Sequence, residues 1–442
     1  DYGPMRIEPR VLKGFRDFLP DQASKRSKII STLTQTFEKF GFQPIDTPVL
    51  EYTDVLLGKG SGETDKQIYR FEDQGGRDVS MRFDLTVPFA RFMALHENEL
   101  SIPFKRYHID KVWRGENTQR GRYREFTQCD FDIVGIDNAP ADFEILLLMH
   151  RSFRELGIGG ITIKVNHRGI FNRFLSNLGV QADSTEIMRT IDKREKIGQE
   201  KMREELAGLM DTGKADRVLS YIESGGGFEE TLSRMTELAG GEDEDTRRLS
   251  EIGKALSEVG ISGSFELDPS IMRGLDYYTG IVYETFLDAL PEIGSVCSGG
   301  RYNDLASLYT KTRLPGVGSS IGLDRLIAGL EEIEGAAFEG RAADAAVFNL
   351  DDRLTGYYQS LAESLRDAGI RIDVFMEKKK LGQQFKTAEK KHIPAAVICG
   401  EDERASGTIT VKNLLNRESG EYSSVRDAAD AILRIVAGSE GA

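Results

Sequence analysis

At 442 residues, with 39% hydrophobic and 29% charged side chains, the chain has the length and composition of a globular protein of two or three domains, which excludes intrinsic disorder. No apolar run approaches the roughly 18 residues that a membrane span needs. The net charge of −14 argues against a nucleic-acid partner, but basic clusters at residues 105–124 and 378–391 keep such a partner open. The cysteines are too scattered for a zinc site or a disulfide framework and favour a reducing cytoplasm: Cys129, Cys297 and Cys399.

The first 170 residues alternate between helical and extended patterns. In chain order they predict a helix over 21–40, an extended edge strand with two prolines over 41–56, a hairpin about Gly75 and Gly76, a helix over 86–98, two antiparallel strands joined by a long loop within 104–135, a helix over 142–156 and a strand over 161–166. Most of the candidate functional residues fall on the two long strands and their loop.

Residues 171–259 are charged, helix-friendly and free of proline, which predicts a helical insertion with an exposed turn at Gly240–Asp245. Strand patterns then return, in chain order, at 277–288, 294–305 and 316–332, the last of which runs into a helix. A linker over 331–343 follows. Beyond it, short apolar strands alternate with helical patterns, and this alternation predicts a small α/β domain with a parallel sheet covered by helices on both faces.

The two long strands and their loop concentrate polar side chains of two kinds. Gln128, Asp130 and Asp132 alternate along the second strand, so they share one face of the sheet. Arginines in and beside the loop suit phosphate groups, because the planar guanidinium donates two hydrogen bonds at once. A buried carboxylate such as Asp132 suits a cationic or hydrogen-donating group of a ligand. On this stretch alone, a charged surface hairpin explains the pattern equally well.

Three further stretches place polar residues in sequence that otherwise predicts buried core: "MRFDLTVPFAR", "RGLDYYTG" and "GVGSSIGLDR". Singly, each has a structural explanation, because Asp84 could cap a helix, the tyrosines could be core aromatics and Arg325 could be a helix-surface cation. "GKGSGETDK" lacks the spacing of a Walker phosphate-binding loop and is rejected.

Together these stretches resemble the histidyl-tRNA synthetase family of class II aminoacyl-tRNA synthetases over nearly the whole chain. "GFQPIDTPVLE", "WRGENTQRGRYREFTQCDFDIVG" and "GVGSSIGLDRL" resemble the three motifs that define the class, and "RGLDYYTG", "GGRYNDL" and "LKGFRDFLP" resemble segments specific to the family. The resemblance implies an α+β fold: a class II antiparallel-sheet catalytic domain in two parts (5–170 and 261–333), a helical insertion (171–260) and a C-terminal α/β anticodon-binding domain (344–437).

The resemblance also implies roles for individual residues. Those expected to bind ATP are Arg114 at the α-phosphate, Glu116 at the adenine amino group, Arg122 at the outer phosphates, and Phe126 and Arg325 on the two faces of the adenine ring. Those expected to bind histidine are Asp84, Thr86 and Gln128 at the α-amino group, Asp132, Tyr277 and Tyr278 at the imidazole, and Arg114 and Arg273 near the carboxylate. Arg273 and Arg114 would be catalytic, by stabilising negative charge in the transition state. Gln119 and Arg120 would meet the acceptor end of a tRNA.

The implied activity is that of a histidine–tRNA ligase, which makes histidyl-adenylate from L-histidine and ATP and transfers histidine to the 3′ end of its tRNA. Mg²⁺ would bridge the phosphates, and no protein ligand for a metal can be assigned. The implied assembly is a cytoplasmic homodimer that binds no membrane. The alternative is the synthetase-like regulatory subunit of ATP phosphoribosyltransferase, which senses histidine and acylates no tRNA. Such subunits generally lack the C-terminal domain and keep the catalytic arginines poorly, so the ligase is favoured.

Overall fold

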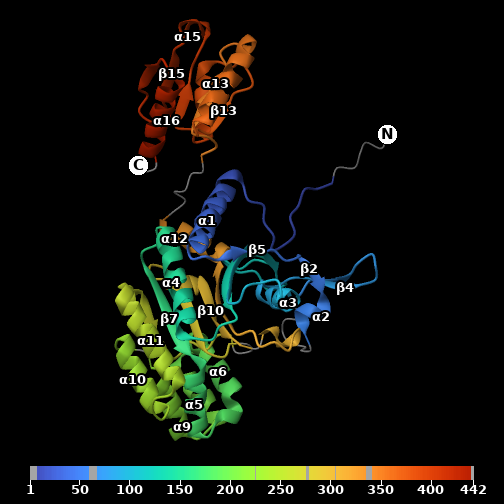
Figure 1. Ribbon diagram of the computed structural model, residues 1–442, viewed down its shortest axis with the longest axis vertical. Coiled ribbons are helices and arrows are strands. Elements are labelled where there is room, and N and C mark those ends of the chain that lie inside the picture. Colours follow the sequence, from blue (N-terminus) through green and yellow to red (C-terminus); the bar gives the residue numbers. More distant parts are fainter. Residues whose placement is uncertain are drawn as a thin grey trace. The chain divides into compact units, whose positions relative to one another are not determined.

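The computed structural model describes residues 7–58, 67–223, 225–274, 278–303, 305–334 and 341–439 (Figure 1). The chain divides into a larger unit of residues 1–17 and 26–335 and a smaller unit of residues 18–25 and 336–442. Within the described residues, no helix combines the length and the apolar character needed to cross a membrane.

An eight-stranded sheet is the centre of the larger unit, with strand order β1-β5-β6-β11-β10-β9-β7-β8. Its strands are β1 (Gln43–Pro44), β5 (Phe104–Trp113), β6 (Glu125–Val134), β7 (Ile161–His167), β8 (Phe265–Leu267), β9 (Ile281–Leu287), β10 (Cys297–Tyr302) and β11 (Gly316–Gly322). From β5 to β7 in this order, each strand is antiparallel to its neighbour. The short edge strands are parallel to theirs, β1 to β5 and β8 to β7. The predicted antiparallel pair β5–β6 and the edge position of β1 are therefore confirmed, whereas β8 was not predicted.

The two faces of this sheet differ in chemistry. Cys129, Phe131 and Ile133 of β6 are buried in the main hydrophobic core, which also contains side chains of helices α1 (Pro20–Lys39), α4 (Ala139–Glu155) and α12 (Leu323–Glu334). α4 begins three residues before the predicted start, because the Asn138 side chain accepts a hydrogen bond from the Ala141 N–H and caps the helix there. The alternate residues of β6 are polar and face the other way.

A three-stranded sheet and two helices stand beside the main sheet. The sheet contains β2 (Leu50–Tyr52), β3 (Arg70–Glu72) and β4 (Asp78–Met81) in the order β2-β4-β3, and the helices are α2 (Thr53–Leu57) and α3 (Thr86–His96). The hairpin about Gly75 and Gly76 and the helix α3 are confirmed. The extended segment predicted over 41–56 is wrong at its end, because the chain turns into α2 directly after β2.

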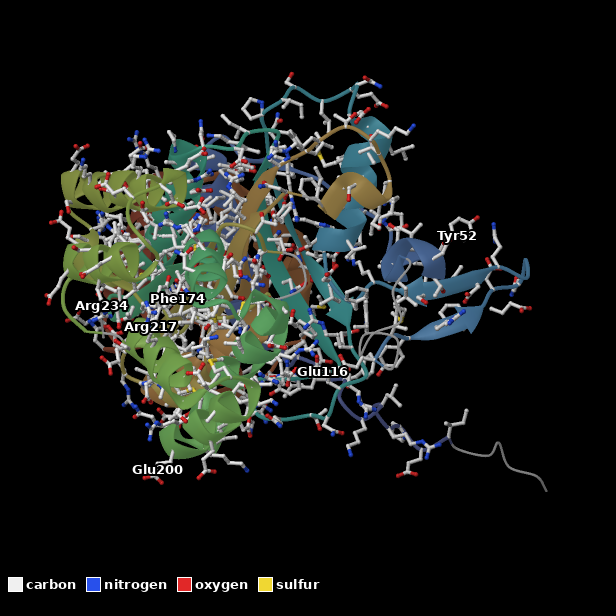
Figure 2. The ribbon with its side chains drawn as sticks, turned by 90° about the horizontal axis from the view of Figure 1, so that it is seen from below. Tyr52, Glu116, Phe174, Glu200, Arg217 and Arg234 are labelled. Carbon is white, nitrogen blue, oxygen red and sulfur yellow. The ribbon has the colours of Figure 1, made fainter. Side chains whose placement is uncertain are left out.

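The insertion is helical, as predicted. Its elements are α5 (Arg168–Leu178), the 3-10 helix η2 (Gln181–Asp183), α6 (Ser184–Asp192), α7 (Arg194–Ile197), α8 (Gln199–Leu209), α9 (Thr212–Ile222), α10 (Phe228–Leu238) and α11 (Glu244–Val259). Phe174 of α5 (labelled in Figure 2) stacks on Tyr221 of α9, with ring centroids 4.5 Å apart. The predicted turn precedes α11, where Asp243 caps the helix by accepting from the Thr246 N–H.

One buried carboxylate joins this insertion to the main sheet. Asp142 of α4 is fully buried and accepts hydrogen bonds from Arg248 of α11 at 2.6 Å and from Arg301 of β10 at 2.8 Å. Two guanidinium groups from distant parts of the sequence therefore share one anion, which offsets the cost of burying all three charges. Short 3-10 helices complete the larger unit: η3 (Ser262–Ser264), η4 (Pro291–Ile293) and η5 (Leu305–Leu308).

The smaller unit is a five-stranded sheet with order β13-β12-β14-β15-β16 and a hydrophobic core of its own. Its elements are β12 (Ala345–Val347), η6 (Asp352–Leu354), α13 (Thr355–Asp367), β13 (Ile372–Val374), α14 (Leu381–Lys390), β14 (Ala395–Val397), α15 (Glu401–Ser406), β15 (Ile409–Asn413), β16 (Ser419–Tyr422) and α16 (Val425–Ser439). β12, β13 and β14 are parallel, as predicted. The prediction of a wholly parallel sheet is wrong, because β15 and β16 add an antiparallel hairpin.

Candidate active site

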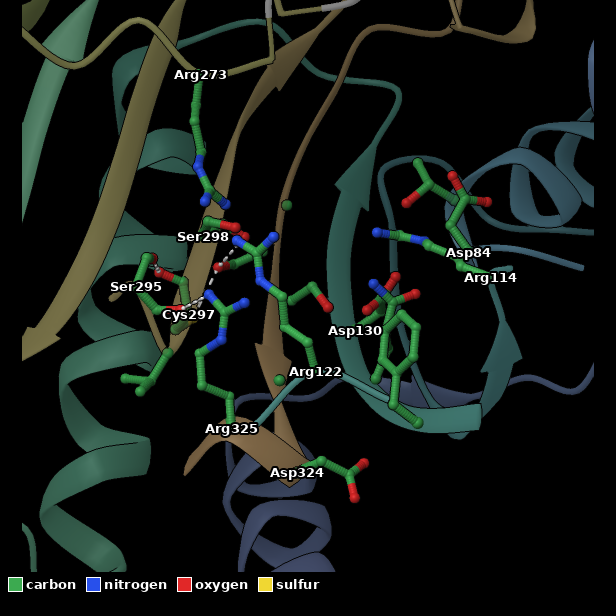
Figure 3. Close-up of a pocket in the computed structure, with 18 of the residues that line it drawn as sticks. Asp84, Arg114, Arg122, Asp130, Arg273, Ser295, Cys297, Ser298, Asp324 and Arg325 are labelled. Atoms are coloured by element: carbon green, nitrogen blue, oxygen red, sulfur yellow. Dashed lines mark hydrogen bonds between the residues drawn. The ribbon is translucent and has the colours of Figure 1, made fainter. Parts of the chain in front are cut away.

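A cavity of about 340 Å³ opens on the polar face of the main sheet (Figure 3). β6, β10 and β11 supply its floor, and the segments before α3, after β5 and before β9 supply side chains around it. The residues predicted from the sequence that line it are Asp84, Thr86, Arg114, Glu116, Arg122, Phe126, Gln128, Asp132, Arg273, Tyr278 and Arg325. Segments from four separate parts of the chain therefore meet in one cavity.

Carboxylates gather at one end of this cavity. Asp130 and Asp132 project from β6, where period-two alternation places them on the same face. The Tyr302 hydroxyl of β10 donates a hydrogen bond of 2.7 Å to Asp132 Oδ1. Asp84 Oδ1 accepts from the Val87 N–H in the first turn of α3. This end of the cavity suits a ligand that carries a positive charge and hydrogen-bond donors.

Burial governs the protonation of these three carboxyl groups. It raises the pKa of Asp130 to about 7, and it raises the pKa of Asp84 and Asp132 above the ordinary range. The positive charge of Arg106, which lies opposite Asp132 on β5, opposes the shift at Asp130 and Asp132. The pocket is therefore set to gain from a cationic ligand, because such a ligand compensates anions that water no longer reaches.

Two glycines leave room for side chains that line this end of the cavity. A Cβ at Gly318 of β11 would come within 1.8 Å of Asp132 Oδ1, and a Cβ at Gly300 of β10 would come within 2.8 Å of the Tyr278 ring. Any larger residue at either position would displace a side chain that lines the cavity. The glycine-rich strands thus act by close approach of backbone to functional side chains.

Arginines gather at the other end. The guanidinium groups of Arg122, Arg273 and Arg325 converge in Figure 3, whereas Asp84 and Arg114 lie across the cavity. Arg273 Nε lies 2.6 Å from Glu284 Oε1, and Arg325 Nη1 donates to the Ser295 carbonyl at 3.0 Å.

The pKa of Arg325 reports how crowded with positive charge this end is. Burial, together with the charges of Arg122 and Arg273, lowers it to about 10. Like charges held so close favour a polyanionic ligand, which a nucleotide phosphate chain provides.

The Phe126 ring lies between the two ends of the cavity, and contacts from helices α1 and α12 hold its strand end in place. The Arg114 guanidinium lies 5.1 Å from the centroid of the Phe126 ring, and its Nε donates to the Phe83 carbonyl at 2.8 Å. Asp324, at the start of α12, accepts from Arg26 Nη1 at 2.7 Å and from the Thr127 N–H at 2.8 Å. These contacts fix the strand end that carries Phe126.

Three of the predicted residues do not lie among those lining the cavity. Gln119 and Arg120 are exposed in the loop between β5 and β6, and Arg120 Nη2 is 2.7 Å from Glu332 Oε2. Tyr277 falls outside the described residues, as does Asp276 beside it.

The cavity also contains residues for which the sequence provided no role. Asp130 was placed on the correct face without a function, and Tyr302 was recognised only as part of "GGRYNDL". Others lie in stretches that the sequence singled out without giving these positions a role, or in and just before β10: Tyr123, Ser295, Val296, Cys297, Ser298, Ser319, Ser320, Gly322 and Asp324. Period-two alternation could have identified Ser298 and Ser320, which lie in register with Asp130, but not Ser319, which alternates with them.

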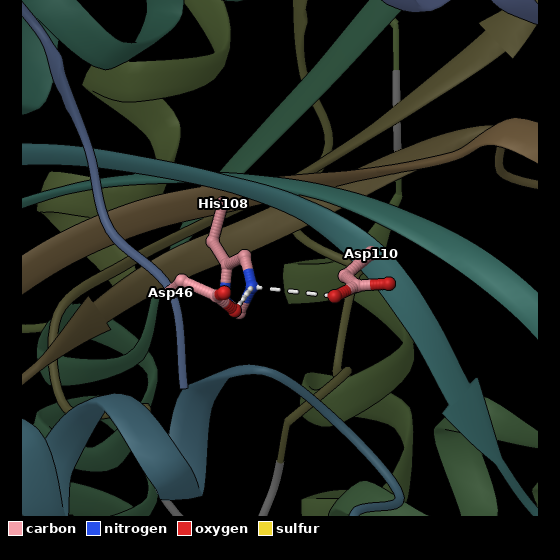
Figure 4. Close-up of side chains that lie close together, drawn as sticks. All are labelled: Asp46, His108 and Asp110. Carbon is pink, nitrogen blue, oxygen red and sulfur yellow. Dashed lines mark ion pairs between the residues drawn. The ribbon is translucent and has the colours of Figure 1, made fainter. Parts of the chain in front are cut away.

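A second polar group, Asp46, His108 and Asp110, lies outside the cavity lining (Figure 4). His108 Nε2 is 3.6 Å from Asp46 Oδ1 and 3.8 Å from Asp110 Oδ2. However, Asp110 also lies 2.7 Å from the buried Arg82. Burial, with the charges of Arg106 and Arg82, lowers the pKa of His108 to about 3. The two arginines oppose a bound cation, so we assign no metal to this group.

Comparison with known proteins agrees with the geometry of the cavity. The profile of the histidyl-tRNA synthetase family matches residues 14–326, and that of an anticodon-binding domain matches residues 344–434. The histidine–tRNA ligase of Treponema denticola is 50% identical over 404 residues, which cover 90% of each chain. That of Rhodopirellula baltica is 46% identical over 97% of this chain and 99% of its own.

Solved structures agree with these relatives. The histidyl-tRNA synthetase of Nostoc sp. PCC 7120 superposes with a TM-score of 0.89 at 32% identity, covering 97% of this chain and all of that one. An ATP phosphoribosyltransferase regulatory subunit/histidyl-tRNA synthetase from Bacillus halodurans has a TM-score of 0.72 at 23% identity, covering 87% of this chain and 96% of that one, which shows the shared fold alone. On the family profile and the identity to these relatives, the chain belongs to the histidyl-tRNA synthetase family.

Proposed function

We propose that this chain, as a histidine–tRNA ligase, binds L-histidine at the carboxylate end of the cavity and ATP at the arginine end. The observation that carries the proposal is this division of one cavity into an anionic and a cationic half. An amino acid whose ammonium group faces the carboxylates has its own carboxylate directed toward the arginines, where the α-phosphate of ATP would lie.

At the carboxylate end, Asp84, Thr86 and Gln128 would hold the α-amino group. Asp132 and Tyr278 would hold the imidazole ring, and Tyr277 is proposed beside them on sequence grounds alone. Support comes from the burial of Asp132 and its hydrogen bond from Tyr302, since a fixed carboxylate accepts one particular ring N–H.

At the arginine end, a carboxylate oxygen of histidine would attack the α-phosphorus, and the bond to the β-phosphate would break, releasing pyrophosphate. Negative charge increases in the transition state, and Arg114 and Arg273 are proposed to stabilise it. Arg122 would bind the outer phosphates. Glu116 would accept from the adenine amino group, and the ring would lie between Phe126 and Arg325.

Mg²⁺ is proposed to arrive with ATP, because phosphate oxygens are the ligands that this ion prefers. The arginines at this end fit a nucleotide, because they and the ion together would neutralise the charge of its phosphates. We assign the ion no protein ligand. Its contribution would be to neutralise part of the phosphate charge.

The second half-reaction needs a tRNA, and the smaller unit is proposed to bind its anticodon. Its lysine-rich segment at 378–391 supports this, as do the exposed Gln119 and Arg120 for the acceptor end. We also propose the division of the chain into four parts, at residues 5–170, 171–260, 261–333 and 344–437. The chain is proposed to form a homodimer through the segment at 41–51. A cytoplasmic location is proposed as well, and the buried free cysteines support it.

The regulatory-subunit alternative is not favoured. It would need no anticodon-binding unit and no cluster of arginines in the cavity, and this chain has both.

ATP–pyrophosphate exchange, measured with each of the twenty amino acids supplied singly and without tRNA, tests the proposal. We expect exchange with histidine alone. Histidine binding by calorimetry without any exchange would contradict the proposal and favour a sensor of histidine.

A further inference from the structure

Arg106 is a fully buried arginine of β5 that lies beside the carboxylate end of the cavity, on the same face of the sheet as Asp132, and is not among the residues that line the cavity. The strand register places it opposite Asp132 of β6. Its Nη2 lies 2.7 Å from Asp132 Oδ2 and 3.7 Å from Asp130 Oδ2. On its other side, the guanidinium lies 4.2 Å from the centroid of the Phe89 ring of α3. One cation is therefore held between two carboxylates of the floor and an aromatic ring.

The contacts of Arg106 are dominated by charge. Its Nε, Nη1 and Nη2 make no aligned hydrogen bond among the described residues. Within the described residues, its side chain thus acts as a positive charge whose burial costs free energy. Burial of an arginine is costly unless nearby anions compensate it, so this position must serve the two aspartates.

The charges around Arg106 do not balance. Asp84, Asp130 and Asp132 all line this end of the cavity, and the cations near them are Arg114, whose charge lowers the pKa of Asp84, and Arg106, which forms ion pairs with Asp130 and Asp132. Asp132 is the better placed of its two partners by 1.0 Å, from 2.7 Å against 3.7 Å, and it also accepts from Tyr302. The structure therefore favours an ionised Asp132, with Asp130 only partly compensated.

We propose that Arg106 is a positioning residue of the histidine pocket, which holds the Asp132 carboxylate in place and ionised so that the imidazole N–H meets an anion. This inference rests on the proposed function and adds a residue to which no substrate contact is assigned. Arg106 acts through Asp132, and Asp130 competes with Asp132 for its charge.

The same charge reaches groups on every element packed around the floor. Arg106 lowers the pKa of groups on four elements: Asp84 before α3, His108 of β5, Asp130 and Asp132 of β6, and Tyr302 of β10. Of these, Asp132 and Asp130 are the carboxyl groups that form ion pairs with Arg106. They are therefore the groups whose ionisation should change most when Arg106 is replaced.

Arg106→Gln tests the inference in the ATP–pyrophosphate exchange assay, first at pH 7. We expect the KM for histidine to rise by about 10- to 100-fold, because the variant leaves a buried carboxylate without its partner. The KM for ATP should change by less than about threefold, since the arginine end is untouched.

The pH dependence separates this role from a purely structural one. Without Arg106 the pKa of Asp132 rises further, so a larger share of its carboxyl groups is protonated at low pH and the carboxylate is restored as the pH increases. The ratio of the variant's KM for histidine to that of the unmodified protein should therefore fall as the pH increases, by at most about tenfold per unit. Titration of free histidine cancels in this ratio. A ratio that stays near one, or that is raised equally at every pH, would overturn the inference.

A further variant keeps the test decisive if Arg106→Gln folds poorly. Arg106→Lys keeps the charge and should hold the KM ratio within about fivefold at every pH. A rise in the KM for histidine with Arg106→Lys that is as large as that expected for Arg106→Gln would show that the charge is not what the pocket needs and would contradict the inference.

Arg82→Gln is the matched control, because Arg82 is an equally buried arginine that pairs with Asp110 outside the cavity. It should lose stability without giving a pH-dependent KM ratio. The unmodified protein must show histidine-dependent exchange before any variant is compared. If the unmodified protein shows no histidine-dependent exchange, the proposed function is refuted. The positioning inference is then tested by calorimetry, in which the same variant-to-unmodified ratios are expected for the Kd of histidine.

Discussion

Arg273→Ala should leave the fold intact and nearly abolish adenylate formation. Arg273 is 44% exposed but its partner Glu284 is only 11% exposed, so its removal takes an ion-pair partner from a largely buried carboxylate and should cost about 1–3 kcal/mol of stability, less than a folded domain typically has. Its guanidinium lies at the end of the cavity where two other arginines converge. The substitution therefore removes function without removing core.

The size of the kinetic effect follows from where charge develops. Attack of a carboxylate on a phosphate adds negative charge at the α-phosphate, and a preorganised donor at such a position typically contributes 10²- to 10³-fold, or about 2.7–4 kcal/mol. Arg122 and Arg325 remain in the variant and keep ATP bound. The loss should thus appear mainly in kcat for exchange, with a smaller change in the KM for ATP.

The assay is ATP–pyrophosphate exchange at saturating histidine, together with thermal unfolding of the same preparation. Arg203→Ala is the control, because Arg203 is a comparably exposed arginine that pairs with Asp216 in the helical insertion, at 2.8 Å. That variant should retain normal exchange. An Arg273→Ala variant that exchanges within about threefold of normal would refute the reasoning.

Three further substitutions test the floor of the cavity and its support. Tyr302→Phe removes the hydrogen bond to Asp132 and should raise the KM for histidine by about 10-fold or more, as expected for a bond to a charged group. Gly318→Ala should raise the same KM without affecting that for ATP, because its Cβ would meet the Asp132 carboxylate; an equal rise in both would show a wider distortion. Asp142→Asn weakens both of the ion pairs that Asp142 forms with arginines, so it should lower the free energy of unfolding by about 3–5 kcal/mol, measured as a lower urea midpoint. An unchanged midpoint would mean that these ion pairs make no net contribution to stability.

Strand alternation made the floor of the cavity predictable. In "QCDFD" every second residue is polar, and the structure places Gln128, Asp130 and Asp132 in the cavity lining and their neighbours Cys129 and Phe131 in the core. Helix caps were less visible, so α4 begins earlier than predicted. The hairpin β15–β16 was missed because it interrupts an otherwise regular strand–helix alternation.

The chemical pairings could not be predicted from local pattern. Tyr302 and Asp132 are separated by 170 residues in the sequence, and no spacing rule joins them. Asp130 stood on the predicted face, yet its raised pKa depends on burial and on Arg106, neither of which the sequence displays. Resemblance to a family supplied roles for its known positions and had nothing to say about these.

The anion shared between α4, α11 and β10 makes the helical insertion an integral part of the catalytic unit rather than a removable module. Asp142 is 106 residues from Arg248 and 159 residues from Arg301, so residues 168–259 are tied at their far end to the strand that carries Tyr302. A shortened chain that omits these helices would leave Asp142 with only one of its two arginines. Minimal versions of this enzyme should therefore keep α11, or replace Arg248 with another cation, before anything else is trimmed.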